Sequence, residues 1–277
     1  MSEKLQSYAH QIAGTHPTDG TIGIFWIGQA GFILRGRSTT LAVDAYLSPR
    51  ETRRYDAPVA AAELGFVDAF LATHEHIDHL DLPQLPAFAA AAGHARFVVP
   101  VPLAAGAAEA VGAARVTGAA PDVPIAIGDA RITPIAACHG VHVADAYSFG
   151  LVAGEHRYLG YVIELGGLRV FHAGDTIRYD GMAERLRALD VEVALLPING
   201  RSAEREEQDL VGNLSAEEAA DLAADAGVRA VIPMHYELFR HNSGRAADLV
   251  ERATTAHPDL AVHVLPRYGG MLYTALR

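Results

Sequence analysis

Apolar residues gather in short stretches along this chain, and the spacing within each stretch predicts a secondary-structure element. In the first half, short runs separated by glycines and polar residues predict strands that meander back and forth, and runs with helical spacing follow them. The predicted elements are a helix over residues 4–14, strands over 23–28, 31–34, 40–44, 67–72 and 97–100, and helices over 82–92 and 104–114.

The second half repeats this order, with strands first and then mixed strands and helices. Gly166-Gly167 is a two-residue hairpin signal between two predicted strands, and Ser215 with Glu218 fits a capping box at the start of a helix. The predicted elements are strands over 125–127, 130–136, 161–165, 168–173, 191–196, 230–234 and 261–265, and helices over 182–189, 215–226 and 245–256.

The connection between the halves bears on the fold. No stretch rich in Pro, Gly and Ser divides the sequence, so we expect a single domain over residues 1–277. Elements in this order suit the α+β class, as an αββα four-layer sandwich in which two mixed sheets pack face to face with helices outside. The long segment 199–212 lacks periodicity and is polar and charged, which is typical of a functional loop or of disorder.

Composition argues against several classes of protein. With 22 Lys and Arg against 33 Asp and Glu, the net charge is −11, which argues against binding a nucleic-acid polymer or an anionic membrane. The single cysteine, Cys138, excludes an internal disulfide and a multi-cysteine zinc motif. The first residues lack a signal-peptide pattern, and the longest apolar run, 97–108, is too short to span a bilayer, so we expect a cytoplasmic protein.

Histidine is abundant, with 14 residues in 277, and it is the commonest metal ligand, although most of these could simply fill surface or core. The sharpest cluster, His-x-His-x-Asp-His, follows the predicted strand 67–72. If the chain leaves that strand extended, His74 and His76 face the same way and can bind one cation. Asp78 and His79, at the start of the next helix, can then reach a second cation. Imidazole and carboxylate ligands suit Zn, Mn or Fe.

Further metal ligands are expected at the ends of other strands, because four residues do not fill two sites. Asp175, His235 and His139 each follow an apolar strand. Asp175 is the natural shared ligand, His139 would complete the first site, and His235 the second. His142 is the alternative third ligand of the first site. We prefer His139 because it directly follows its strand, whereas His142 lies three residues into a loop and could contact substrate instead.

The order of these residues, His-x-His-x-Asp-His, then His, Gly-Asp and His, resembles the metallo-β-lactamase superfamily and its αββα sandwich. The resemblance covers nearly the whole chain. Additional motifs are similar to the L-ascorbate-6-phosphate lactonase branch of that superfamily. They are Trp26–Phe32, Asp44–Ser48, Gly160-Tyr161, His172–Thr176, Leu196–Arg201, Val211–Asn213 and Ile232–Tyr236, with Phe239 and Asn242.

This resemblance implies a function and a set of site residues. The function is metal-dependent hydrolysis of a small phosphorylated sugar-acid lactone, or of a related phosphorylated compound, with two divalent ions, Mn²⁺ or Zn²⁺. Asn199 and Arg201 would lie near the substrate, and the family often forms homo-oligomers. The implied metal ligands are His74, His76, Asp78, His79, Asp175 and His235.

A shared water between two divalent ions explains the expected chemistry. Two ions bridged by Asp175 lower the pKa of that water toward neutrality, and the resulting metal-bound hydroxide attacks a carbonyl carbon or a phosphorus. Asp78 can orient the hydroxide as well as bind metal. His172, beside the Gly-Asp turn, is either a catalytic acid or ligand partner, or a packed strand histidine.

A small anionic substrate needs positive groups in an acidic protein. Arg201 offers a planar fork for carboxylate or phosphate beside the neutral donor Asn199, although the charged stretch that it begins could be only a solvated face. Arg50 is a further candidate. Tyr236 either hydrogen-bonds the substrate or packs.

Two other functions remain open at this point. A metal-dependent phosphodiesterase acting on a small or cyclic phosphodiester would use the same water chemistry. The second alternative is a metal site for sensing or redox chemistry, since diiron flavoprotein relatives use this fold for oxygen chemistry. The His-x-His-x-Asp-His motif is the hydrolytic form, which favours hydrolysis.

Overall fold

The computed structural model describes residues 7–274, and within this range the strands form two large sheets and one small hairpin. The first sheet runs antiparallel from β16 to β3 and parallel from β3 to β6. Its strands, in spatial order, are β16 (Gly270–Thr274), β1 (Thr21–Gly28), β2 (Gly31–Arg35), β3 (Thr40–Val43), β4 (Ala69–Leu71), β5 (Arg96–Pro100) and β6 (Val116–Ala119).

The second sheet mixes the two directions in the same way. Its strands are parallel from β15 to β12 and antiparallel from β12 to β7. In spatial order they are β15 (Ala261–Val262), β14 (Ala230–Met234), β13 (Val193–Pro197), β12 (Leu168–His172), β11 (Leu159–Leu165), β8 (Ala130–Ala136) and β7 (Ile125–Ile127). A separate hairpin pairs β9 (Leu151–Val152) with β10 (Glu155–His156).

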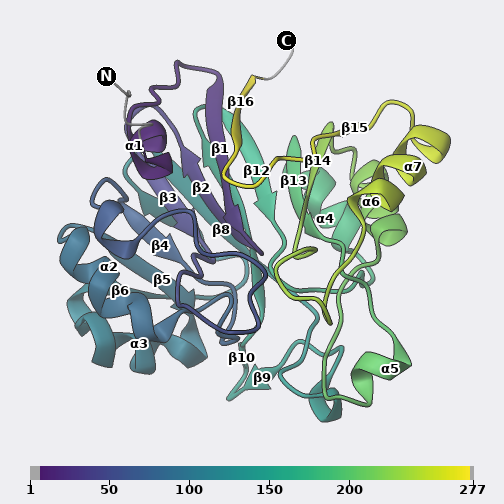
Figure 1. Cartoon of the computed structure of the whole chain (residues 1–277), viewed down its shortest axis with the longest axis horizontal. Helices are drawn as coiled ribbons and strands as arrows, with labels where there is room; N and C mark the ends of the chain where they lie inside the picture. Colours follow the sequence, from purple (N-terminus) through teal and green to yellow (C-terminus); the bar gives the residue numbers. More distant parts are fainter. Residues whose placement is uncertain (1–6, 275–277) are drawn as a thin grey trace.

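Helices cover the outer face of each sheet, as Figure 1 shows. The outer face of the first sheet packs against α1 (Tyr8–Ala13), α2 (Leu85–Ala91) and α3 (Ala104–Val111). The second sheet packs against α4 (Met182–Ala188), α6 (Ala216–Asp225) and α7 (Ala246–Ala256). This arrangement confirms the predicted αββα sandwich of the α+β class. Among residues 7–274, no helix is both long and apolar enough to cross a membrane.

Short helical segments complete the chain. The four-residue helix α5 (Ala203–Glu206) lies in the segment 199–212, for which the sequence showed no periodicity. The 3₁₀ turns are η1 (Ala61–Glu63), η2 (Leu82–Gln84), η3 (Val101–Leu103), η4 (Ala113–Arg115) and η5 (Val143–Asp145).

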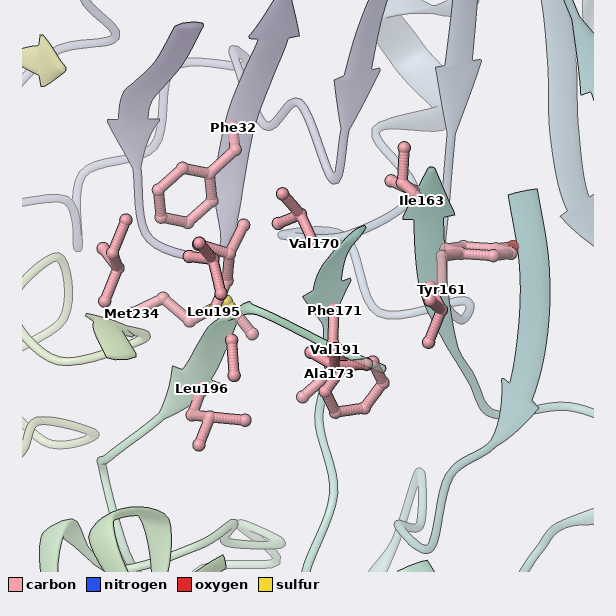
Figure 2. Close-up of a cluster of buried hydrophobic side chains, with 14 of the residues drawn as sticks. Phe32, Tyr161, Ile163, Val170, Phe171, Ala173, Val191, Leu195, Leu196 and Met234 are labelled. Atoms are coloured by element: carbon pink, nitrogen blue, oxygen red, sulfur yellow. The ribbon is translucent and has the colours of Figure 1, made fainter. Parts of the chain in front are cut away.

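The two sheets pack face to face over one apolar core. Figure 2 shows Phe32 from β2 in the same cluster as Val170 of β12, Leu195 of β13 and Met234 of β14. Each fully buried side chain of this kind contributes about 1.5–3 kcal/mol. Strand β1 is buried along its whole length because one face meets the second sheet and the other meets helices, which is why it reads as a continuous apolar run.

Two local sequence signals produced the expected geometry. Gly166 and Gly167 both have positive φ, 63° and 82°, as a two-residue hairpin turn between β11 and β12 requires. At the start of α6, Ser215 accepts a bond from the Glu218 backbone N–H, and Glu218 accepts one from the Ser215 N–H. Both the hairpin and the capping box are therefore confirmed.

Several element boundaries differ from the sequence predictions. Strands β6, β9, β10 and β16 were not predicted, and the strand expected over 261–265 ends at Val262. The helix expected from Leu82 begins as the 3₁₀ turn η2 and becomes α-helical at Leu85, because Pro83 and Pro86 remove backbone donors. Residues 4–6 of the predicted first helix lie outside the described residues.

Candidate metal centre

After β4, the segment that carries the histidine cluster forms a turn and not the start of a helix. The N–H groups of His79 and Leu80 both donate to the carbonyl of His76, at 2.9 and 2.8 Å. This reversal corrects the expectation that Asp78 and His79 begin a helix. It also brings the rings of His74 and His79 together, with centroids 4.0 Å apart.

Among the described residues, two groups of side chains could each hold a cation. Within each group the ligand atoms lie within 4.8 Å of one another. The first group is His74, His76, His139 and Asp175, and the second is Asp78, His79 and His235.

In the first group, three imidazoles and a carboxylate converge from separate parts of the second sheet and the β4 loop. Nδ1 of His76 lies 2.9 Å from Nε2 of His74 and 3.4 Å from Nε2 of His139. Nε2 of His139 lies 3.6 Å from Oδ2 of Asp175. The structure thus brings His139 into this group.

Asp175 stands between the two groups. Its Oδ1 lies 3.3 Å from Nε2 of His79, and its Oδ2 lies 3.3 Å from Nε2 of His235. The turn that carries it needs a glycine, because Gly174 has φ +60° and a Cβ there would lie 2.7 Å from the Leu159 carbonyl. In the second group, Oδ2 of Asp78 lies 3.4 Å from Nε2 of His235.

A buried carboxylate that sequence reasoning did not assign, Asp44, orients this cluster. It follows β3 and accepts from the Thr73 N–H at 2.9 Å and the Thr73 hydroxyl at 2.8 Å. Its Oδ2 also lies 2.6 Å from Nδ1 of His79. These contacts fix the His79 ring so that Nε2 faces Asp175. Its position at a strand end, the signal that identified Asp175, could have found Asp44.

Gln29 is a second residue that the sequence left without a role. It is buried in the β1–β2 turn with φ +51°, and its carbonyl accepts from the backbone N–H of His235 at 3.0 Å. Its side-chain amide donates to Oδ2 of Asp78 at 2.9 Å, and Nε2 of His235 lies 3.1 Å from the same nitrogen. Gln29 therefore fixes the side chains of Asp78 and His235 relative to each other.

The two groups differ in charge without metal. Burial and the neighbouring imidazoles lower the pKa of His74 well below its usual value, and burial lowers the pKa of His139 to about 3. Burial would also lower the pKa of His235, but the carboxylates of Asp175 and Asp78 outweigh it and raise that pKa to about 9. Against the same burial, Asp175 and Asp44 raise the pKa of His79 well above its usual value. Without metal, the imidazoles of His74 and His139 in the first group are therefore neutral at pH 7, and those of His79 and His235 in the second group are protonated.

The donor set fits divalent cations. Nε2 of His79, Oδ1 of Asp175, Nδ1 of His139 and Nδ1 of His235 are buried and have no hydrogen-bond partner among the described residues. Two of these atoms, on His79 of the second group and Asp175 of the first, lie 3.3 Å apart where the groups meet. Buried polar atoms that lack partners destabilise a protein, and coordination to a cation would satisfy those that face it.

A cavity of about 230 Å³ opens onto both groups. Its floor is formed by His76, Asp78, Asp175 and His235. Apolar side chains form part of its wall, and its polar rim consists of Arg50, Thr52, Asp209, His241 and Asn242. A space of this size suits a small molecule.

The two residues expected to hold the substrate anion lie just outside this cavity. The Arg201 guanidinium donates to both carboxylate oxygens of Glu218 and to the carbonyl of Asn213. Asn199 is buried, and its amide donates to Oδ1 of Asn242, which lines the cavity. The structure therefore does not bring Arg201 to the cavity and brings Asn199 to it only through Asn242.

The remaining predicted residues pack around the site. His142 is exposed, with Nδ1 2.7 Å from Oδ2 of Asp209. His172 is fully buried, with Nε2 2.7 Å from the carbonyl of Ala30. Tyr236 stacks on Trp26, with ring centroids 5.4 Å apart. Of the residues predicted for catalysis, Asp78 reaches the cavity and His172 does not.

Comparisons with known proteins show the family to which this chain belongs. A profile of the Beta-lactamase superfamily domain matches residues 39–236. A UPF0173 metal-dependent hydrolase of Myxococcus xanthus (strain DK1622) is 32% identical over 226 residues, which cover 80% of this chain and 73% of the relative. A UPF0173 protein of Pyrococcus furiosus is 32% identical over 216 residues, which cover 78% of this chain and 84% of that relative.

A solved structure shows the same fold. Igni18, a metallo hydrolase from the archaeon Ignicoccus hospitalis, matches with a TM-score of 0.72 and 19% identity, over 92% of this chain and 100% of that one. At this identity the likeness concerns the fold alone.

Proposed function

Because this chain belongs to the beta-lactamase superfamily and is a metal-dependent hydrolase, we propose that it hydrolyses a small phosphorylated sugar-acid lactone. The observation that carries this proposal is the pair of ligand groups on the floor of a small polar cavity, with Asp175 of the first group 3.3 Å from two ligands of the second. We propose that these groups hold two divalent ions, Mn²⁺ or Zn²⁺. When bound, the ions supply Lewis acidity and a water of lowered pKa at neutral pH.

The chain's own residues orient the reactants. Asp78 lies on the cavity floor, and its contacts with His79 and His235, which outweigh its burial, keep its pKa well below the usual value. It is therefore a carboxylate at pH 7 and can accept a hydrogen bond from the attacking water. Opening a lactone ring releases an alkoxide oxygen that needs a proton. We assign this role to His241, the rim imidazole that belongs to neither ligand group.

The rim favours an anionic substrate. Arg50 is exposed at the cavity rim, and among residues 7–274 no carboxylate forms an ion pair with it. Its guanidinium is thus free to bind a carboxylate or phosphate oxygen. At the same rim both carboxylate oxygens of Asp209 are engaged, one by the Val143 N–H and the other by Nδ1 of His142.

A comparison of two substrates tests the proposed reaction. We expect the metal-loaded protein to open a sugar-acid lactone phosphate, such as L-ascorbate 6-phosphate lactone, much faster than it cleaves bis-p-nitrophenyl phosphate. Fast cleavage of the diester with an inert lactone would instead identify a phosphodiesterase acting on small or cyclic phosphodiesters. The same assay with His241→Asn should show a lower kcat at unchanged metal content.

A further inference from the structure

A second cavity, rich in arginine, adjoins the metal cavity. It measures about 520 Å³, and its basic lining residues are Arg53, Arg54, Arg240, His241 and Arg267. We call it the arginine pocket. It shares Thr52 and His241 with the rim of the metal cavity, so the two spaces meet at these side chains.

Three segments that are far apart in the sequence build the arginine pocket. Figure 1 shows the dark-blue loop after β3 beside the yellow-green loop after β14. Arg53 and Phe239 form an isolated antiparallel bridge between these loops, and the Arg54 N–H donates to the Leu238 carbonyl at 3.0 Å. Arg267 comes from the segment before β16, and its guanidinium lies 4.2 Å above the ring of Tyr55.

The loop after β3 is itself held firmly. The buried carboxylate of Asp81 accepts from the backbone N–H groups of Leu47 and Ser48, at 2.8 and 2.7 Å, and from the Ser48 hydroxyl at 2.6 Å. The guanidinium of Arg53 donates to the carbonyls of Tyr46 and Ser48. The backbone that presents Arg54 is therefore anchored on both sides.

The pocket carries uncompensated positive charge in an acidic protein. Among residues 7–274, no carboxylate forms an ion pair with Arg54 or Arg240, and Arg267 pairs with Glu237 at 2.7 Å. Of the lining residues, only Glu51 is acidic. Arg53 binds backbone carbonyls, so its charge is not neutralised either. The chain's net charge of −11 makes this local excess of guanidinium groups the more distinctive.

A cluster of guanidinium groups suits an oxyanion ligand. Their planar forks bind phosphate and carboxylate oxygens through paired N–H donors, and a phosphate dianion can engage several at once. A substrate whose reacting ring lies over the metal ligands could pass Thr52 and His241 and place a terminal phosphate among these arginines.

We propose that the arginine pocket, through Arg54 and Arg240, binds the phosphate group of the substrate while the lactone ring occupies the metal cavity. This assignment rests on the proposed function for the reacting end of the substrate. It assigns phosphate recognition to this pocket in place of Arg201, which is paired with Glu218.

Binding is tested first, independently of turnover. The Zn²⁺-loaded protein, labelled with ¹⁵N-arginine, is titrated with inorganic phosphate while the arginine Nε–H signals are followed by NMR. We expect saturable shifts for the pocket arginines, and about fivefold weaker phosphate binding in Arg240→Ala, equivalent to roughly 1 kcal/mol. Arg37→Ala is the matched control, because Arg37 is exposed and pairs with Asp19 away from the pocket. Arg240→Ala separates this pocket from phosphate bound at the metal ions, because the variant leaves the metal ligands intact.

Kinetics then identify the source of the phosphate. Arg240→Ala should raise KM about fivefold for the lactone phosphate, with kcat unchanged, and leave KM for the unphosphorylated lactone as it is. Absence of saturable shifts, or shifts equal to that of Arg37, would overturn the proposal. An equal KM change for both lactones would also overturn it, because the pocket would then bind a separate anion or act structurally. If neither lactone is hydrolysed, the proposed function fails while the NMR titration still decides whether the pocket binds phosphate.

Discussion

Replacing Asp44 with asparagine should weaken both the fold and the metal centre. The carboxylate is fully buried and accepts three contacts, from the Thr73 N–H, the Thr73 hydroxyl and Nδ1 of His79. In Asp44→Asn, one oxygen becomes an NH₂ group, which cannot accept. If the remaining oxygen keeps the Thr73 N–H, the amide donor faces the hydroxyl and the His79 ring nitrogen.

The size of the effect follows from what is lost. The 2.6 Å contact between Asp44 and His79 is a charge-assisted hydrogen bond, which contributes about 1.5–3 kcal/mol. A buried donor left facing another donor adds to that loss, so we expect the free energy of unfolding to fall by about 3–5 kcal/mol. For a chain of this size the melting temperature should drop by roughly 10 °C. A freely rotating His79 ring should reduce metal affinity by about 10- to 100-fold.

Two assays measure these effects in the same samples. Thermal unfolding with and without EDTA gives the stability change, and competition with a chromogenic chelator gives the metal affinity. Asp19→Asn is the matched control, because the Asp19 side chain is exposed and pairs only with Arg37. If Asp44→Asn unfolds within about 2 °C of the native protein and keeps its metal affinity, Asp44 does not orient His79 as described.

Three further predictions concern charge and metal. In the metal-free protein the pKa of His235 is raised to about 9, so the stability from its charged form is complete below its ordinary pKa of about 6.5 and is lost as pH rises through 9. Melting temperatures across this range should fall more steeply for the native protein than for His235→Ala, and equal slopes would refute the assignment. EDTA treatment should abolish hydrolysis, and added Mn²⁺ or Zn²⁺ should restore it; activity that survives complete metal removal would exclude the metal-dependent mechanism. Arg201→Ala should lower the free energy of unfolding, measured by chemical denaturation, by no more than about 1 kcal/mol, since its pair with Glu218 is partly exposed. It should also leave KM unchanged, and a raised KM would show that Arg201 binds the substrate.

Local patterns were enough to predict most of the sheet framework. The runs behind β1, β13 and β14 are apolar throughout because both faces of these strands are covered. Strand β16 escaped prediction because it lies at the sheet edge, half-exposed, and its pairing with β1 joins the two ends of the chain. No window of sequence contains both partners of that pairing.

The candidate site likewise has residues that local patterns predict and residues that depend on distant partners. His74, His76, Asp78 and His79 are neighbours in sequence, and Asp175, His139 and His235 follow apolar strands, so spacing and strand ends were enough to nominate them. The substrate residues depended on tertiary partners instead. Arg201 looked free in the sequence, but Glu218 of the α6 capping box lies beside it in the fold. The arginine pocket is assembled from three distant segments, and no single stretch of sequence contains it.

The proposed mechanism requires the two ligand groups, with Asp175 between them, to hold two divalent ions. It is tested most directly by loading the purified protein with Zn²⁺ or Mn²⁺, removing free metal by desalting, and measuring metal per chain by inductively coupled plasma mass spectrometry. We expect about two ions per chain, as dinuclear hydrolases hold. A stoichiometry of one ion or none would contradict it.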